Sequence, residues 1–507
     1  MKVKLPDIKR GNPAYAAEAD SVDCCVVGGG PAGVVLALLL VRQGVEVLLL
    51  EAQADFDRDF RGDTVHASTL HLLAQLGLLE RFLDVAHAVG DDFPTHFPDG
   101  SISPRGRGRL PTAQPTYRVP QARLLELLAG EAQRYPSFRL VMGGRVEDLI
   151  KCDGVVRGVR YRAPDGMHSV AATLVVGADG RFSKVRQSAG LPLVTSDEAM
   201  DVLWLRLPRG TGDPERAAGI YLGPPGHGPM VVADRAEAWQ IGYLFPKGSL
   251  ARLRADGLPA LRAAITARAA WLADAVEHLQ NWRQTSVLIV QAGRVPRWYR
   301  PGLLLIGDAA HVMSPVAGVG INYAIQDAVV AANLLGPRLR QGRVRTVDLA
   351  SVQRRRELPT RLMQLFQHAM AHRVGTSSEP LHGARWLDRG FDLPPVRAVR
   401  ERLIAYGGFR PEHVRAIPAE PLRRRAGKSW VAGLVAVAVL LAIACSLAAA
   451  SVAEPTSTVE PASVSAVTPV PLATPECWVS GDLVGDANPA EVRAAVCGFS
   501  VRFQPEG

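Results

Sequence analysis

Residues 22–51 read VDCCVVGGGPAGVVLALLLVRQGVEVLLLE, and their pattern is typical of one fold class. The four apolar residues from Cys24 to Val27 predict a buried strand, and three glycines follow it in the spacing G-x-G-x-x-G. An apolar helix comes next and stops at Gly44, and the second strand, 45–50, ends in Glu51. A strand, a glycine corner, a helix and a second strand in this order predict a βαβ unit and an α/β fold.

Each glycine of the corner has a separate physical task in such a unit. Gly28 permits the tight turn, Gly30 lets the backbone approach a pyrophosphate, and Gly33 lets helix and strand pack closely. The helix that begins at Pro31-Ala32 offers free N–H groups and a positive dipole end to phosphates. Glu51 lies where an acid accepts hydrogen bonds from ribose hydroxyls, so we predict a dinucleotide site for NAD or FAD. The alternative is a glycine-rich turn that serves packing alone.

Two later stretches favour FAD over NAD. Residues 174–186, LVVGADGRFSKVR, predict a third strand that ends at Asp179-Gly180, and residues 302–308, GLLLIGD, predict a fourth. Glycine corners therefore follow three strands, between residue 28 and residue 308. A simple nicotinamide dehydrogenase needs one such corner, whereas a long cofactor that lies extended across the domain meets several.

The three motifs, in this order and spacing, resemble the class A flavoprotein monooxygenases, the p-hydroxybenzoate hydroxylase-like family. The resemblance covers roughly residues 20–400 and includes RGDTVHASTLHLLAQLGLLERF (61–82), YRVPQARLLELLAGEA (117–132) and GLLLIGDAAHVMSPVAGVGIN (302–322). It implies a Rossmann-like α/β FAD-binding domain with an inserted β-sheet substrate domain. A C-terminal transmembrane helix, discussed below, completes the predicted architecture.

The resemblance also implies a role for each matching residue. Gly28, Gly30, Pro31, Ala32 and Gly33 would bind the FAD pyrophosphate, Glu51 the adenosine ribose, and Arg61 and Gln121 further parts of FAD. Asp179, Gly180 and Arg186 match a motif that serves FAD and the transient nicotinamide cofactor, and Gly307-Asp308 would hold the ribityl chain. Gly318, Gly320, Ile321 and Asn322 would offer backbone N–H groups to the flavin ring, and the Pro315 carbonyl would line the substrate side as the catalytic position.

Simpler roles stay open for several of these residues. Asp308 could be a helix N-cap, Arg61 a surface arginine and Arg186 a member of a helix-face ion pair. His311 is better explained as a packed or capping residue than as a catalytic base. A structural role is also favoured for His66 and His71, although one of them could face the flavin.

The activity that the resemblance implies is oxygen insertion. The family reduces FAD with NADH or NADPH, forms a flavin C4a-hydroperoxide with O₂, and hydroxylates or epoxidises a small aromatic or other electron-rich substrate. The first alternative is an FAD-dependent reductase or dehydrogenase of the same fold, such as an isoprenoid reductase. The second is a non-catalytic flavin-binding, membrane-tethered protein. The substrate, the choice between NADH and NADPH, and the oligomeric state stay open.

Composition excludes some other classes. The chain has 507 residues and a net charge of +9, without a Lys/Arg block interleaved with aromatics, so no nucleic-acid partner is predicted. Six cysteines occur without a CxxC pair or a Cys/His cluster at zinc spacing, and no metal site is predicted. Cys24 and Cys25 lie in an apolar strand and are expected to pack in the core.

The predicted domain organisation is discontinuous. We expect an extension at 1–20, the FAD-binding domain at 21–90, 116–189 and 290–340, the substrate domain at 91–115 and 190–289, and a helical segment at 341–421. The substrate domain contains strand-like runs such as VLWLRLP and AWQIGYLFP. Trp204, Arg206, Tyr221 and Tyr243 are candidates for its inner face, although such aromatics are more often core residues.

The end of the chain differs from the rest. Residues 430–450 form an uncharged apolar run of transmembrane length, which Arg423, Arg424, Arg425 and Lys428 precede. The positive-inside rule then predicts an enzyme on the cytoplasmic face of the cell membrane, anchored by one helix, with the C-terminus outside. A Pro/Thr/Ser-rich linker (451–476) and a small tail (477–507) follow, in which Cys477 and Cys497 could pair. The alternatives are a buried core helix, or the signal segment of a secreted protein fused to the enzyme.

Overall fold

A computed structural model describes residues 20–57, 64–89, 94–102, 116–196, 198–214, 217–223, 228–235, 238–376 and 394–415. Arg61, the predicted membrane segment 430–450, the linker 451–476 and the tail 477–507 lie outside these ranges, as does the N-terminal extension up to residue 19. Within the described ranges, no helix combines the length and the apolar character that a membrane crossing requires.

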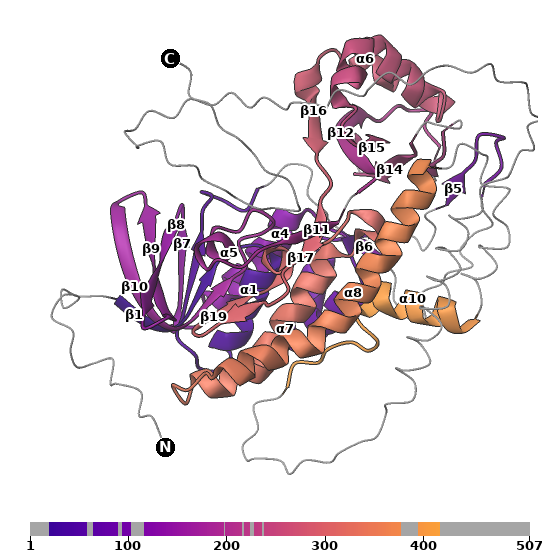
Figure 1. Cartoon of the computed structure of the whole chain (residues 1–507). Coiled ribbons are helices and arrows are strands. Elements are labelled where there is room, and N and C mark those ends of the chain that lie inside the picture. Colours follow the sequence, from indigo (N-terminus) through magenta and orange to yellow (C-terminus); the bar gives the residue numbers. More distant parts are fainter. Residues whose placement is uncertain are drawn as a thin grey trace, which may run out of the picture. The chain divides into compact units, whose positions relative to one another are not determined.

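The central layer is an eight-stranded sheet in the order β18-β19-β10-β1-β2-β7, which β9 and β8 extend from β10 (Figure 1). Its strands are β1 (Asp20–Val27), β2 (Val47–Glu51), β7 (Phe138–Met142), β8 (Arg145–Cys152), β9 (Val155–Ala163), β10 (Gly166–Gly177), β18 (Tyr299–Arg300) and β19 (Leu303–Leu305). The pairs β1–β10, β1–β2, β2–β7 and β10–β19 are parallel. Strands buried on both faces of a parallel sheet are apolar throughout rather than alternating, which explains the CCVV and VLLL runs.

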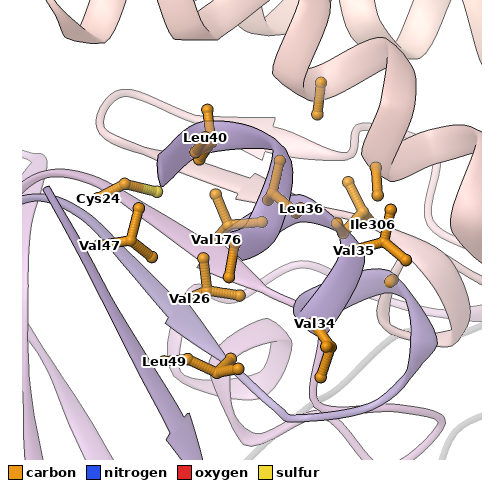
Figure 2. Close-up of a cluster of buried hydrophobic side chains, with 14 of the residues drawn as sticks. Cys24, Val26, Val34, Val35, Leu36, Leu40, Val47, Leu49, Val176 and Ile306 are labelled. Atoms are coloured by element: carbon orange, nitrogen blue, oxygen red, sulfur yellow. The ribbon is translucent and has the colours of Figure 1, made fainter. Parts of the chain in front are cut away.

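Helix α1 (Pro31–Val41) lies between this sheet and helix α7 (Gly320–Leu339). Ten of its eleven residues are buried, because the helix is apolar on every side and has neighbours on every side. Figure 2 shows Val34, Leu36 and Leu40 of this helix in one cluster with Val26, Val176 and other side chains of the sheet. Cys24 and Cys25 are free and fully buried, which confirms their predicted place in the core.

Six further described helices belong with the central sheet, α1 and α7. They are α2 (Ala67–Leu76), α3 (Leu79–Leu83), α4 (Gln121–Ala132), α5 (Lys184–Ser188), α8 (Thr346–Thr376) and α10 (Pro394–Tyr406). Helix α7 packs against α1, α2 and α8, and α10 packs against α2 and α8. Two small sheets of three strands each also belong to this part of the chain. One has the order β3 (Thr64–Val65), β6 (Thr116–Arg118) and β4 (His87–Val89). The other has the order β11 (Val194–Ser196), β17 (Ala292–Arg294) and β20 (His311–Val312).

A second sheet has six strands in the order β16-β12-β15-β14-β13-β5. They are β5 (Thr95–His96), β12 (Met200–Pro208), β13 (Gly219–Tyr221), β14 (Met230–Asp234), β15 (Ala238–Pro246) and β16 (Thr285–Leu288), all from the ranges predicted for the substrate domain. Helix α6 (Leu250–Thr266) packs its Leu261 and Ile265 into the core of this sheet, and it kinks at Gly257, whose φ is +85°. The short 3₁₀ turns Ala270–Leu272, Ala275–His278 and Trp282–Gln284 lead from α6 to β16.

Candidate active site

Three glycine corners meet at one edge of the central sheet. Val27 at the end of β1 lies beside Leu50 of β2 on one side and Gly177 of β10 on the other, and Gly177 lies beside Leu305 of β19. The first corner is residues 27–33, the second is residues 177–186, and the third is residues 307–322. Ligands of open α/β sheets bind outside the carboxyl ends of the strands, which is where the three corners lie.

The first corner is shaped by close backbone approach. Gly28 has a φ of +104°, and a Cβ there would lie 2.5 Å from the carbonyl oxygen of Ala178. A Cβ on Gly33 would lie only 1.9 Å from the carbonyl oxygen of Gly28, so helix and turn can touch only if residue 33 is glycine. Gly30 differs, because a Cβ there would meet nothing within 4 Å. The space beside Gly30 is therefore open, as the approach of a phosphate would require.

Helix α1 begins at this corner without a cap. Gly30 is the N-cap residue and has no side chain that could cap the first turn, and Pro31 takes the first helical position. Proline suits this position because the missing N–H has no intrahelical acceptor there. The N–H groups of Ala32 and Gly33 therefore face the corner, where the positive end of the helix favours an anion.

Glu51 closes the first corner from β2 and is buried. Its Oε2 accepts a hydrogen bond from the N–H of Gly29 at 2.7 Å, and its Oε1 accepts one from the N–H of Gln53 at 2.9 Å. The carboxylate is thus fixed beside the glycine turn, at the end of the strand next to β1. This is the position from which an acid reaches a ribose in a dinucleotide site.

The second corner is held by its own side chains. Asp179 accepts hydrogen bonds from the hydroxyl of Ser183 and, at 3.0 Å, from the N–H of Val185, while Gly180 turns the chain with a φ of +81°. Burial raises the pKa of Asp179, although these hydrogen bonds oppose the rise. Arg186 is buried and donates to the carbonyl oxygens of Arg181 (2.8 Å) and Ala309 (3.2 Å). Arg186 therefore links the second corner to the third. These hydrogen bonds go to backbone carbonyl oxygens, whereas the alternative from the sequence was an ion pair on a helix face.

The third corner begins with the turn Gly307–Ala309, directly after β19. Gly307 has a φ of +58°, and its N–H donates to Asp327 Oδ2 at 3.0 Å. Asp308 lies in this turn, whereas the N-cap of α7 is Val319, so Asp308 does not cap the helix that follows. His311 is fully buried and bonds through Nε2 to Asp327 Oδ2 at 2.6 Å, which supports the packed role over the catalytic one.

The middle of the third corner is a tight loop fixed from helix α8. The loop contains Pro315 and the 3₁₀ turn Val316–Gly318, in which Ala317 has a φ of +65° and Gly318 one of +58°. A left-handed alanine costs about 1–2 kcal/mol, so other contacts must hold the loop. Gln367 supplies them, since its Nε2 donates to the carbonyl oxygens of Ser314 (2.8 Å) and Val316 (2.7 Å).

The last part of the third corner is the start of α7 at Gly320 and Ile321, which has no side-chain cap. Asn322 is fully buried, and its Oδ1 accepts from the hydroxyl of Thr69 at 2.8 Å. His66 lies 3.3 Å through Nε2 from the carbonyl oxygen of Gly318. Burial lowers the pKa of His66 to about 4, so the neutral ring donates from Nε2 and keeps a lone pair on Nδ1.

Several buried polar atoms near these corners have no hydrogen-bond partner among the described residues. They are Nδ1 of His66, Nδ2 of Asn322 and Oε1 of Gln121, which is the first residue of α4. Buried polar atoms without partners are rare and indicate a missing ligand or water. Together with the open side at Gly30 and the uncapped starts of α1 and α7, they fit a long cofactor with phosphates at one end and a polar ring at the other.

The two faces of the six-stranded sheet separate the candidates of the predicted substrate domain. Trp204 pairs with Gly242, and a Cβ on Gly242 would lie 2.7 Å from the indole, so the ring lies across the glycine. The indole Nε1 is buried and has no partner among the described residues. Tyr221 and Tyr243 lie in the core on the face that α6 covers, which confirms for these two the core role that the sequence favoured, and they do not share the face of Trp204. Arg206 shares the face of Trp204, because the two are separated by one residue on β12.

The structure also shows residues that the sequence analysis missed. Asp327, Arg356 and Gln367 hold the third corner but do not belong to any of the recognised motifs. A signal existed in one case, because Asp327 is an acid in the largely apolar helix α7, directly after Gln326 and five residues after Asn322. Arg61 lies outside the described residues, so its predicted contact with the cofactor stays a prediction.

Comparison with known proteins identifies the class. A family model described as "FAD binding domain" matches residues 21–365. The 6-methylpretetramide 4-monooxygenase of Streptomyces rimosus is 36% identical over 417 residues, which cover 78% of this chain and 95% of that relative. The digeranylgeranylglycerophospholipid reductase 1 of Methanococcoides burtonii is 26% identical and covers 66% of this chain and 79% of its own length. The solved structure of p-nitrophenol 4-monooxygenase from Pseudomonas putida has a TM-score of 0.62 at 22% identity, over 78% of this chain and 100% of that one.

The corners, their common edge and these relatives define an FAD-binding α/β enzyme. The chain belongs to the class A flavin monooxygenase family, as the three motifs predicted, and it is an FAD-dependent oxidoreductase of the monooxygenase type. FAD as the cofactor and the α/β FAD-binding fold are confirmed. NADH or NADPH is the co-substrate that is typical of this family.

Proposed function

We propose that this chain hydroxylates a flat, polycyclic, electron-rich aromatic compound. The observation that supports the substrate class is the likeness to 6-methylpretetramide 4-monooxygenase over 95% of that relative's length. The face of the second sheet that carries Trp204 fits such a compound, because an indole that lies across Gly242 of the neighbouring strand offers a ring face and its N–H offers a hydrogen bond.

The proposed roles of the site residues follow the three corners. Gly28, Gly30, Pro31, Ala32 and Gly33 hold the pyrophosphate, Glu51 the adenosine ribose, Asp308 the ribityl chain, and residues 318–322 the ring. Arg61, Gln121, Asp179 and Arg186 support FAD, with the second corner open to the nicotinamide cofactor as well. The carbonyl of Pro315 lines the substrate side.

The chemistry then depends on placement. When bound, FAD would supply the redox chemistry: hydride acceptance from NADH or NADPH and activation of O₂, with one oxygen atom going to the substrate and the other to water. The uncapped start of α7 would turn its positive end toward the ring and stabilise negative charge there. Neutral His66 adds no charge there.

The test uses the purified chain and a tetracyclic phenol as a probe substrate. We expect a flavin spectrum that bleaches under anaerobic NADPH or NADH, and a product that has gained one oxygen atom by mass spectrometry. A product that has gained hydrogen without oxygen would favour the reductase alternative, for which the archaeal relative gives a precedent. Flavin that stays oxidised with excess NADH and NADPH would favour a non-catalytic flavin protein.

We also propose that residues 430–450 tether the enzyme to the cytoplasmic face of the cell membrane, with the C-terminus outside. The support is the apolar run itself and the four basic residues at 423–428 that precede it. Cell fractionation of the full chain and of a chain ending at residue 421 tests this. We expect the full chain in the membrane fraction and the shortened chain in the supernatant with its flavin. Release of the tail as a separate secreted polypeptide would favour the fused-segment alternative.

A further inference from the structure

A buried ionic cluster lies directly behind the third corner. It consists of Asp327 on α7, Arg356 on α8 and His311 on β20, and all three side chains are at most 2% exposed. Arg356 Nε donates to Asp327 Oδ1 at 2.7 Å, and His311 Nε2 lies 2.6 Å from Asp327 Oδ2. None of the three belongs to the positions through which FAD is expected to bind.

The carboxylate of Asp327 has a second task. Its Oδ2 also accepts the N–H of Gly307 at 3.0 Å, so both of its oxygens are in use. Gly307 is left-handed, and it precedes Asp308 directly. The hydrogen bond fixes the Ile306–Gly307 peptide, one residue before Asp308, and so it helps to set the direction of the carboxylate that the proposed function assigns to the ribityl chain.

The charge state of Asp327 suits this task. Burial raises the pKa of a carboxylate, but His311 and Arg356 outweigh this effect and hold the pKa of Asp327 below its usual value. The group is therefore an anion at neutral pH. An anion accepts the three hydrogen bonds at once, whereas a neutral amide of the same shape would place a donor against one of the three donors.

Arg356 connects the cluster to the last described segment of the chain, residues 394–415. Its Nη1 donates to the carbonyl oxygen of Gly407 at 2.7 Å, and the hydroxyl of Tyr323 donates to the carbonyl oxygen of Leu403 at 3.2 Å. Gly407 is left-handed with a φ of +63°. Residues 403–407 lie beyond the family match, which ends at residue 365, yet two of their carbonyls bond to side chains that pack behind the third corner.

We propose that Asp327 and Arg356 are positioning residues of the flavin site, and that residues 403–407 form its outer support. Asp327 holds Gly307-Asp308 in the orientation that FAD requires, and Arg356 holds Asp327 while Gly407 holds Arg356. This inference rests on the proposed place of FAD at Asp308.

The experiment compares Asp327→Asn with Glu131→Gln in the full chain. Glu131 is a matched control, because it is a buried acid of α4 whose ion-pair partners, Arg81 and Arg134, lie outside the three corners. We measure the FAD dissociation constant of the apoprotein, the visible circular dichroism of bound FAD, and the FAD midpoint potential. Asp327→Asn should weaken FAD binding at least tenfold and change both the dichroism and the potential, while Glu131→Gln should leave all three unchanged.

A second pair of variants keeps the proposal testable if Asp327→Asn does not fold. Asp327→Leu with Arg356→Leu removes both buried charges together, which restores folding where a lone buried charge would prevent it. The double variant should fold and still bind FAD at least tenfold more weakly than the wild type. Wild-type affinity and dichroism in Asp327→Asn or in the double variant would overturn the positioning role. A wild-type chain without affinity for FAD would instead count against the proposed function.

Discussion

The first and third corners do similar work with different means. The first corner is made mainly by residues that are close in sequence, since Gly33 meets Gly28 five positions earlier and Glu51 reaches Gly29 from the next strand, and Ala178 beside Gly28 is its distant neighbour. The third corner relies on distant residues, because Gly307 is held by Asp327, the 314–316 loop by Gln367 and Gly318 by His66, which is 252 positions away. A local corner is fixed once its βαβ unit forms, whereas the third corner is fixed only when α2, α7 and α8 have packed.

The largest effect is expected at the first corner, from Gly33→Ala. The new methyl group would lie 1.9 Å from the carbonyl oxygen of Gly28, and backbone cannot move away as a side chain can. We expect a loss of more than about 3 kcal/mol in the free energy of unfolding, measured by urea denaturation.

Gly30→Ala is the matched control for that variant. Its φ of −76° suits alanine, and the methyl group meets nothing within 4 Å. The free energy of unfolding without FAD should change by less than about 0.5 kcal/mol, while FAD binding weakens at least about tenfold. Equal stability losses in the two variants would show that the corner is not built by local contact.

The next effect concerns the third corner and pH. Since burial lowers the pKa of His66 from 6.5 to about 4, the unfolded chain takes up a proton as pH falls through 6.5, and the folded chain does so only near 4. Stability from this group is therefore present above pH 6.5 and lost on acidification, by about 2–3 kcal/mol at pH 4.5. His66→Gln can still donate to Gly318. In this variant the free energy of unfolding, measured by urea denaturation at several pH values, should depend less on pH than in the wild type. An unchanged slope in His66→Gln would contradict the buried, neutral state.

A smaller effect separates the loop from the helix that holds it. Gln367→Met removes two hydrogen bonds to the third corner and should cost about 2 kcal/mol, together with weaker FAD binding. Gln364→Met is the control one turn earlier on α8, because Gln364 donates to the carbonyl oxygens of Gly293 and of Val312, which lies in β20 and outside the 314–316 loop. Similar losses of stability are expected, measured by thermal unfolding, with weaker FAD binding in Gln367→Met alone. If both variants bind FAD equally well, the loop needs no distant support.

The smallest effect is expected at the second corner. Ser183 is the N-cap of α5, where its hydroxyl accepts from the N–H of Arg186 at 2.9 Å and donates to Asp179. Ser183→Ala should reduce the free energy of unfolding by about 1 kcal/mol, as the loss of an N-cap usually does, and chemical denaturation would measure it. If Ser183→Ala reduced the free energy of unfolding as much as Gln367→Met does, the second corner would depend on distant contacts, as the third corner does.

The same contrast explains what could be predicted from the sequence. The strands 24–27 and 45–50, the helix between them and the positions of the three corners follow from glycine spacing and apolar runs, which act over short distances. Asp327, Arg356 and Gln367 could not be assigned, because their partners are brought to them by the packing of helices. The face that Tyr243 takes could not be assigned for another reason. Tyr243 pairs with Leu203 on β12, and a difference of one residue in register would reverse the face.

The two buried cysteines allow the opening rate of the core beside the first corner to be measured by thiol labelling. Burial raises the pKa of Cys25 to about 12 and that of Cys24 well above its usual value, so neither thiol reacts while β1 stays in the sheet. Cys152, at the end of β8, is exposed and reacts at once. In a chain that ends at residue 421, a thiol reagent would therefore label one site immediately and two more at the rate at which the central sheet opens. Comparing that rate with and without FAD would report how firmly the cofactor keeps the sheet closed.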